Sequence, residues 1–346
     1  MSQTVAPLVD TILDRSVVGG YTSIGYRMRS RTWRGSDLQR LEGKVVAVSG
    51  ATSGVGLAAA EGFARLGASV RLLVRNEERG AQARAAIIER TQNKDVRTTV
   101  CDLSSLESVR ECAIRLAAQG PLHVLVNNAG VMTQERAQSA DGIELTLATN
   151  VIGPFLLTTL LIPLLKQSAP ARVINVSSGG MYTQRIAVDD LQSEHDQFDG
   201  PKVYARTKRA EVILTELWAE QLAGSGVVVH AMHPGWVDTP GVRSSLPRFY
   251  TVTRPFLRTP AEGADTIVWL GGATQPGRSS GRFWHDRRQR PTHWLRSTRE
   301  SRQERERLLE ECVRLSGWRD ASAPTAVSAV PAELPASPRR IPVGGS

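Results

Sequence analysis

Short, nearly continuous apolar segments alternate with longer segments of helical periodicity from Gly43 onward, and this alternation restricts the chain to few folds. Six segments are rich in valine, isoleucine and leucine: 44–50, 69–74, 96–103, 123–130, 172–178 and 227–235. Strands that are buried on both faces have this composition, as in a parallel sheet covered by helices on each side. Between them, segments such as "GLAAAEGFARLGA" place apolar residues at helical spacing. The sequence therefore predicts an α/β fold with a single doubly wound domain over 43–290 and a mainly parallel sheet flanked by helices.

Charged and low-complexity segments flank this domain. Residues 1–42 form an N-terminal arm, and residues 291–319 alternate arginine with glutamate, which predicts a charged C-terminal helix with an ion-paired face. Residues 320–346 are rich in alanine, proline and serine, a composition typical of a disordered tail. Much of the formal charge of +9 comes from arginines outside the patterned core, Arg29 among them. Because such an excess is weak evidence for binding nucleic acid, we expect no nucleic-acid partner; steeply salt-dependent binding that is lost without residues 286–346 would favour one.

The cysteines and the apolar segments bear on the compartment. Neither metal-binding nor redox spacing occurs among the three cysteines, Cys101, Cys112 and Cys312. Reduced thiols in a cytoplasmic protein without a metal site are expected. The longest apolar run, 153–165, is shorter than the about 20 residues that span a bilayer, and no secretory signal is evident. Residues 8–33 mix apolar side chains with arginines and either rest on an anionic membrane surface or pack on the core, with Gly19 and Gly20 breaking the helix.

The first predicted strand runs directly into the glycine-rich turn "SGATSGVGLAAA" at the start of a helix. Gly50 permits a tight turn, Gly54 lets a pyrophosphate approach the backbone, and Gly56 allows the helix to pack closely on the strand. The N-terminus of the helix then presents unpaired N–H groups and a positive dipole to the phosphates. This order of strand, turn and helix predicts a dinucleotide-binding Rossmann domain.

The end of the second predicted strand bears on the choice of cofactor. In NAD-selective folds an acidic residue at this point binds the ribose hydroxyls, whereas a basic residue suits a 2′-phosphate. Here Val74 is followed by Arg75, and no carboxylate occurs before Glu77. The sequence therefore favours NADP(H) over NAD(H). The alternative is that Arg75 is an ordinary surface arginine, since the glycine turn holds no second basic residue.

Tyr204 and Lys208 stand four residues apart in "VYARTKRAEV", a stretch without proline or glycine. Side chains at this spacing lie on one face of a helix, so a phenol and an ammonium group can act together. A free phenol has a pKa of about 10 and is a poor acid or base at neutral pH unless nearby positive charge favours its phenolate. Lys208 would supply that charge. On its own the pair is more often a solvated helix face, so the other motifs must decide.

An ordered set of motifs supports the catalytic reading. The set comprises Ser49-Gly50-x-x-x-Gly54-x-Gly56, Asp102-Leu103, "NNAG" (127–130), Asn150, "NVSS" (175–178), Tyr204-x-x-x-Lys208 and "HPGWVDT" (233–239). Together these motifs resemble the short-chain dehydrogenase/reductase family over the whole predicted domain. The segments "SSGGM", "VYARTKR" and "SGRFWHDR" further resemble the member 12 subgroup of that family, whose natural substrate is undefined.

The resemblance implies roles for four catalytic residues, Asn150, Ser178, Tyr204 and Lys208. Ser178 would bind the substrate oxygen while Tyr204 gives or takes the proton. Lys208 would also hold the nicotinamide ribose, and Asn150 would position a water in the proton relay or fix a helix distortion. In the family pattern the second serine of such a pair is the catalytic one, so Ser177 is expected to be a neighbour on the cofactor side.

The resemblance also implies a set of cofactor-binding residues. They are Ser49, Gly50, Thr52, Ser53, Gly54, Val55, Gly56, Arg75, Asp102, Leu103, Asn128, Ala129, Gly130, Tyr204, Lys208, Pro234, Gly235, Val237 and Thr239. Asp102 would contact the adenine and Thr239 the nicotinamide carboxamide, while Asn127 would tie neighbouring strands together. Ser49 replaces the family's usual threonine but keeps the hydroxyl.

Two segments are expected to shape the substrate site. Tyr204 lies 26 positions after Ser178, a longer gap than in simpler family members and one shared with the retinol-dehydrogenase-like branch. The added residues would form part of the substrate wall, and His195 among them is expected at the surface. The segment 241–262 resembles the family's substrate lid, and its apolar residues favour a hydrophobic alcohol or carbonyl; the alternative is that they only pack on the core or a partner subunit.

The sequence therefore predicts an NADP(H)-dependent oxidoreductase acting on a small-molecule alcohol/carbonyl pair. A cofactor-binding scaffold or sensor with vestigial catalysis is the alternative. Family habit favours a homo-oligomer through the helices around 104–118 and 152–166, which the N-terminal arm could block.

Overall fold

A single eight-stranded sheet forms the centre of the molecule. The computed structural model describes residues 17–33, 37–195 and 197–319. The strands are β1 Val45–Ser49, β2 Ser69–Val74, β3 Val96–Val100, β4 Val124–Asn127, β5 Ala171–Val176, β6 Val227–Met232, β7 Arg282–His285 and β8 Arg288–Arg290. Their order in the sheet is β3-β2-β1-β4-β5-β6-β7-β8, and only the pair β7 and β8 is antiparallel. The predicted doubly wound α/β fold is confirmed.

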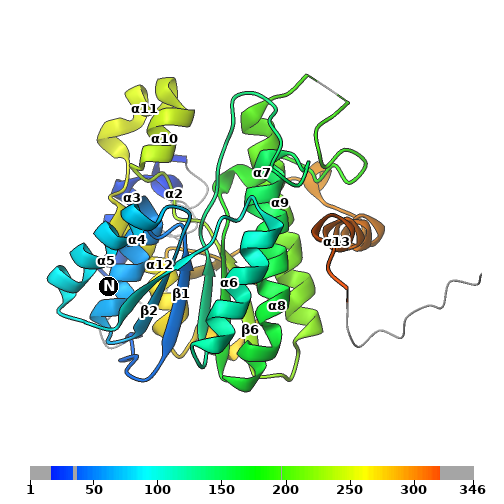
Figure 1. Cartoon of the computed structure of the whole chain (residues 1–346). Coiled ribbons are helices and arrows are strands. Elements are labelled where there is room, and N and C mark those ends of the chain that lie inside the picture. Colours follow the sequence, from blue (N-terminus) through cyan, green and yellow to red (C-terminus); the bar gives the residue numbers. More distant parts are fainter. Residues whose placement is uncertain (1–16, 34–36, 196, 320–346) are drawn as a thin grey trace, which may run out of the picture.

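Helices cover both faces of the sheet (Figure 1). The helices are α2 Val17–Tyr21, α3 Ser23–Ser30, α4 Gly54–Arg65, α5 Glu77–Thr91, α6 Leu106–Ala118, α7 Leu145–Leu147, α8 Gly153–Gln167, α9 Gly200–Gln221, α10 Pro240–Ser245, α11 Pro247–Thr253, α12 Pro260–Gly272 and α13 Arg302–Ser316. One apolar cluster joins the sheet to α4, α5 and α12, and a second joins it to α6, α8, α9 and α13. Burial on both faces explains why the strands consist almost entirely of apolar residues.

The sequence pattern did not predict the two strands at the end of the sheet. β7 and β8 lie in "RFWHDRRQR", where arginine outnumbers apolar residues. The two residues between them, Asp286 and Arg287, have φ values of 50° and 57°. Positive φ at both central positions is the geometry of a two-residue hairpin turn, which usually contains glycine or asparagine. Asp286 suits the first position, but Arg287 stands where glycine is usual, so no hairpin was predicted here.

The described part of the N-terminal arm packs on the core, which is one of the two alternatives proposed from the sequence. The backbone N–H of Trp236 donates to the carbonyl of Tyr21, and Arg29 forms a buried ion pair with Asp286. The expectation that Gly19 and Gly20 break the helix is wrong, because both lie within α2. The break falls at Thr22, the extended residue that precedes α3. Residues 8–16 lie outside the described residues.

Helix α13 packs beside α8 on the face that was expected to form an oligomer (Figure 1). Leu308 and Cys312 are fully buried in the apolar cluster that also contains α6 and α8. The guanidinium of Arg110 on α6 donates to the carbonyl of Ser316 at 2.7 Å. The C-terminal helix therefore covers part of this face. The predicted disordered tail, 320–346, lies outside the described residues.

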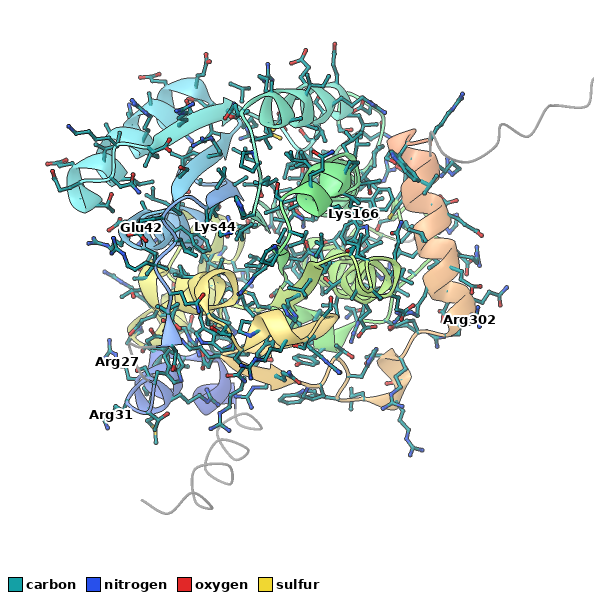
Figure 2. All side chains as sticks on the ribbon, turned by 90° about the horizontal axis from the view of Figure 1, so that it is seen from below. Arg27, Arg31, Glu42, Lys44, Lys166 and Arg302 are labelled. Carbon is teal, nitrogen blue, oxygen red and sulfur yellow. The ribbon has the colours of Figure 1, made fainter. Side chains whose placement is uncertain are left out.

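The arginine-rich segments are largely ion-paired. On α13 and its neighbours the pairs include Arg302–Glu306, Arg314–Glu311, Arg185–Glu304 and Arg307–Asp189. Figure 2 shows Arg302 at one edge of the molecule and Arg27 and Arg31 near the other. Arg29, which was counted with the surface charge, is buried instead. All three cysteines are free thiols and buried.

One helical stretch among the described residues, Leu145–Gln167, is long and apolar enough to cross a membrane. It extends the 153–165 run that seemed too short, because α7 and a π-helical turn over Ala148–Ile152 lead into α8 without interruption. In its most apolar window 83% is buried inside the protein. Burial of this extent is that of a core helix, since a lipid-facing helix would present its apolar side chains outward.

Candidate active site

A cavity of about 700 Å³ opens at the carboxyl ends of the parallel strands. It has the size of a typical cofactor site, and its position is the one where doubly wound sheets bind ligands. The predicted residues that line it are Gly50, Thr52, Ser53, Val55, Gly56, Arg75, Asp102, Leu103, Asn128, Ala129, Gly130, Ser178, Tyr204, Lys208, Pro234, Gly235, Val237 and Thr239. Ser49, Gly54 and Asn150 lie behind this wall. The fold thus gathers residues from most of the chain's length around one cavity.

The glycine turn fits a pyrophosphate. A Cβ on Gly50, whose φ is +65°, would lie 2.9 Å from the Cα of Ala129, and one on Gly56 would lie 2.4 Å from the carbonyl of Gly50. Side chains are therefore excluded at both positions, which lets the turn pack closely on the loop after β4 and on the start of α4. Ser53 is the N-cap of α4, yet its side chain makes no capping hydrogen bond. Its hydroxyl and the first N–H groups of the helix are available to an anion.

Ser49 and Asn127 hold the strands behind the cavity in register. The hydroxyl of Ser49 accepts hydrogen bonds from the backbone N–H groups of Asn128 and Ala129, at 2.9 and 3.0 Å. The side-chain amide of Asn127 donates to Asn175 on β5 at 2.8 Å. These contacts fix the ends of β1, β4 and β5 relative to one another. Both residues therefore support the cofactor-binding side indirectly, by holding these strands in place.

Two arginines border the cavity after β2. Arg75 follows the strand and Arg79 lies in the first turn of α5, and both side chains are exposed. Within the described residues neither forms an ion pair. A cation in the first turn of a helix opposes the helix dipole, at a cost of about 0.3–1 kcal/mol. The sequence analysis missed Arg79, although its position four residues after Arg75 at the start of a predicted helix would have identified it.

Tyr204 and Lys208 lie on one face of α9 and both line the cavity. The ammonium group of Lys208 is 5.6 Å from the centroid of the Tyr204 ring. It donates to the carbonyl of Val176 at 3.0 Å and to the carboxylate of Glu211 at 2.7 Å. Burial lowers the pKa of Lys208, but Glu211 and Tyr204 oppose this and the net shift is upward. Lys208 therefore remains positively charged at neutral pH beside the Tyr204 phenol.

The two adjacent serines have different surroundings. Ser177 is buried, and its hydroxyl donates to the backbone carbonyl of Lys208 at 2.7 Å. Ser178 is half-buried on the cavity wall, and its hydroxyl accepts from the N–H of Gly180 at 3.2 Å. The hydroxyl of Ser178 thus keeps its proton available for a ligand, whereas that of Ser177 is used to hold α9.

Asn150 lies within the π-helical turn Ala148–Ile152, one layer behind the cavity. Its side-chain amide bonds the backbone of Val131 in both directions, at 2.8 and 3.0 Å, and donates to Thr207 on α9 at 3.0 Å. A Cβ on Gly130 would lie 3.3 Å from the Lys208 ammonium and 3.4 Å from the Asn150 oxygen, so these two groups flank the same backbone position. Asn150 thus connects the distorted helix to α9.

A family model described as short chain dehydrogenase matches residues 44–248. The chain belongs to the short-chain dehydrogenase/reductase family. Dehydrogenase/reductase SDR family member 12 of Bos taurus is 42% identical over 293 residues, which cover 84% of this chain and 92% of the relative. Retinol dehydrogenase 12 of Homo sapiens is 38% identical over 283 residues, covering 81% and 88%. The solved NADP complex of Pseudomonas aeruginosa RhlG has a TM-score of 0.59 at 26% identity and covers 70% of this chain and 94% of that one.

These likenesses confirm the resemblance to the member 12 subgroup and set the general chemistry of this short-chain dehydrogenase/reductase. The chain is an oxidoreductase that acts on an alcohol/carbonyl pair with a nicotinamide dinucleotide, because the family and its retinol dehydrogenase relatives share that reaction. The cofactor preference and the substrate class must be inferred from the shape and charge of the cavity.

The histidines of this short-chain dehydrogenase/reductase lie outside the cavity wall. His195 is exposed, as expected, with its ring 3.8 Å from Asp190. His230 is buried between the carbonyl of Pro276 and the indole N–H of Trp284, so its two ring nitrogens are used structurally. His233 stacks on His285 with ring centroids 3.8 Å apart. The described residues contain no cluster of three metal-ligating side chains.

Proposed function

We propose that the protein is an NADP(H)-dependent oxidoreductase that interconverts a hydrophobic alcohol and its carbonyl compound. The observation that carries this proposal is the placement of Ser178, Tyr204 and Lys208 on the wall of the same cavity whose far end is the glycine turn. A ligand bound through its phosphates at that turn would extend toward the three side chains. When bound, the nicotinamide would supply or accept the hydride.

The chain's own residues handle the substrate oxygen and the proton. The Ser178 hydroxyl donates a hydrogen bond to the oxygen, and the Tyr204 phenol gives it a proton in reduction or takes one in oxidation. Lys208 lowers the cost of the phenolate through its charge. Asn150 holds the backbone of Val131 and the hydroxyl of Thr207, and thereby the distance between the cavity wall and α9.

The decisive comparison is Tyr204→Phe against the unchanged protein. We expect NADPH oxidation on hydrophobic aldehydes and ketones to fall about 10²- to 10⁴-fold in the variant, because the phenol is the proton donor. NADPH affinity, measured by fluorescence titration, should change little. Tyr182→Phe is the matched control, since the Tyr182 hydroxyl bonds the carbonyl of Pro291 outside the cavity. Tight NADPH binding by a protein that turns over no carbonyl would instead favour the scaffold alternative.

The preference for NADP(H) rests on Arg75 and Arg79. Both are exposed cations at the cavity, and no ion pair in the described part of the chain neutralises either one. Hydrogen bonds from charged groups contribute about 1.5–3 kcal/mol. We therefore expect Arg75→Ala and Arg79→Ala each to weaken NADPH binding about tenfold or more while NADH binding stays within about twofold. Arg90→Ala, which removes a charge further along α5, should change neither affinity; equal losses for both cofactors would contradict the proposal.

The wall opposite the glycine turn favours an apolar substrate. Met132, Trp236, Leu246 and Phe249 line it, and the rings of Trp236 and Phe249 meet edge to face at 4.9 Å. Leu246 joins α10 to α11 and Phe249 belongs to α11, and these two short helices lie at one end of the molecule in Figure 1. Apolar side chains around a few polar groups are typical of pockets for hydrophobic ligands. Turnover should therefore increase with the apolar surface of the substrate.

Location and assembly complete the proposal. We propose a cytoplasmic protein, with Ile24, Arg27 and Met28 of α3 and Arg31, the residue that follows the helix, as its peripheral membrane contact. Ile24 and Met28 are large apolar residues with 44% exposure, and the two arginines lie close to them in the chain. This combination suits an anionic lipid surface. A homo-oligomer would have to use a surface that α13 leaves open, and sedimentation of the full chain tests it.

A further inference from the structure

The ammonium group of Lys208 is fixed by two hydrogen bonds to the protein. An ammonium has three N–H donors. Two of them are used on the carbonyl of Val176 and on Oε1 of Glu211. The third remains for the cavity that Lys208 lines. Glu211 lies one helical turn after Lys208 on α9, so it fixes where that third N–H points.

Glu211 has a free oxygen in the protein interior. The residue is buried, and within the described part of the chain its Oε2 accepts no hydrogen bond. A second small cavity, of about 10 Å³, lies against it, and the residues around this cavity include Asn127, Asn150 and Asn175 together with apolar residues such as Phe155 and Trp218. This volume is that of about one water molecule.

Asn127, which also lines this cavity, has a second unsatisfied acceptor. Its Nδ2 donates to Thr158 at 2.9 Å and to Asn175 at 2.8 Å, which fixes the orientation of the amide. Its Oδ1 then accepts no hydrogen bond from any described group. Asn127 and Glu211 thus bring two acceptors to one cavity, and two buried acceptors require a donor between them.

We propose that Glu211 is a positioning residue that keeps Lys208 charged and directed at the cavity, and that one buried water molecule donates to both Glu211 Oε2 and Asn127 Oδ1. This inference rests on the proposed function, because it concerns the group that acts on Tyr204. A water molecule is the donor that fits, since it carries two O–H groups and the cavity admits one such molecule.

Electrostatics support this geometry. Burial raises the pKa of Glu211 to about 7, with Lys208 opposing the shift. A hydrogen bond donated to the carboxylate favours its charged form and would keep the ion pair intact at neutral pH. The charged and titratable groups around Glu211 are Lys208 and, beyond it, Tyr204; the other elements packed against the cavity contribute only amides and apolar side chains.

The test is the pH profile of kcat/KM for carbonyl reduction in Glu211→Gln. The amide keeps an acceptor for Lys208 but removes the negative charge, which lowers the pKa of both Lys208 and Tyr204. Reduction needs Tyr204 to carry its proton, so the alkaline loss of activity should move to lower pH by about one unit or more. Glu220→Gln, an exposed carboxylate on the same helix, is the matched control and should leave the profile in place.

An unmoved alkaline limb in Glu211→Gln would overturn the proposal, even if overall activity fell, because a purely structural role lowers activity without shifting the limb. Infrared titration of the unchanged protein gives a readout that needs neither the variant nor turnover. It should show no protonated buried carboxyl at neutral pH, and a crystal structure should show one water between Glu211 and Asn127. A protonated carboxyl band at neutral pH would contradict the proposal. If both of these results are obtained but the protein reduces no carbonyl compound, only the proposed function is overturned.

Discussion

The two sides of the large cavity are built by different means. The cofactor side, formed by β1, β2, β4 and α4, relies on glycines, backbone N–H groups and hydroxyls within a few residues of one another. The closing side is the loop 233–258 together with the two segments that pack behind it, the described part of the N-terminal arm (17–33) and the β7–β8 hairpin. It is joined by charged side chains in the protein interior, from segments that lie more than 200 residues apart.

Asp286 is the centre of the closing side. Its carboxylate accepts hydrogen bonds from Arg29 at 2.8 Å and from Arg258 at 2.6 Å, and all three side chains are 5% exposed or less. Arg258 also donates to the backbone carbonyls of Gly20 and Tyr21, at 3.1 and 3.2 Å. Asp286 therefore binds both Arg29 and Arg258, and Arg258 in turn binds the backbone at the end of α2. The comparison shows that a cofactor site can be built from local backbone geometry, whereas the cover over it depends on long-range charge pairing.

The largest expected effect comes from breaking that pairing. Asp286→Asn leaves Arg29 and Arg258 buried without their counter-charge, and we expect the free energy of unfolding to fall by about 3–5 kcal/mol. Urea denaturation followed by tryptophan fluorescence measures the loss. Asp238→Asn is the control, because Asp238 pairs with Arg243 at the surface of the same side, where such a pair contributes about 1 kcal/mol or less. Similar small losses in both variants would show that the closing side does not depend on the buried charges.

Most of the cofactor side could be predicted from the sequence because its determinants are local. Strand composition, the glycine turn after the first strand, and the spacing of Tyr204 and Lys208 are each contained within a few residues. Arg75 and Ser178 follow the ends of strands, so a predicted strand end also locates its site residue. Glycines and i, i+4 pairs carry the same meaning wherever the rest of the chain lies.

The closing side could not be predicted because its partners are distant in sequence. Arg29 looks like surface charge until Asp286, 257 residues later, is known to face it. Glu211 resembles any polar residue on an amphipathic helix, and only the packing of β4 and α8 over it shows that it is buried. The hairpin at Asp286 and Arg287 is held by the surrounding contacts, although arginine at its second central position disfavours the turn.

A smaller effect tests the cofactor side. In Gly56→Ala the added methyl would lie 2.3 Å from the Asn128 amide and 2.4 Å from the Gly50 carbonyl. We expect a loss of about 1–3 kcal/mol in unfolding free energy, and a loss of NADPH affinity larger than this change in folding alone would cause, because the phosphate turn itself must move. Gly241→Ala is the control, since its methyl would come no closer than 3.9 Å to a neighbouring side chain. Unchanged affinity in Gly56→Ala would mean that the turn does not bind the phosphates.

A dependence on pH also distinguishes the two sides. Burial lowers the pKa of His233 and His285 well below its usual value, and Arg258 adds to the shift of both. Below a pH of about 6.5 the unfolded chain binds protons at these positions while the native protein does not. Stability should therefore decrease as the pH falls, by about 1.4 kcal/mol per pH unit for each histidine.

Acid should consequently loosen the closing side before the cofactor side. Hydrogen exchange measures this, because the N–H of Trp236 bonds the arm at Tyr21 whereas the N–H of Asn128 bonds Ser49. Exchange at Trp236 should accelerate at mildly acid pH while exchange at Asn128 stays slow. His233→Gln should weaken this pH dependence, and His195→Gln, at an exposed position, should leave it unchanged. Equal acceleration at both amides would mean that acid opens the molecule as one unit, and the two sides would then differ in construction but not in stability.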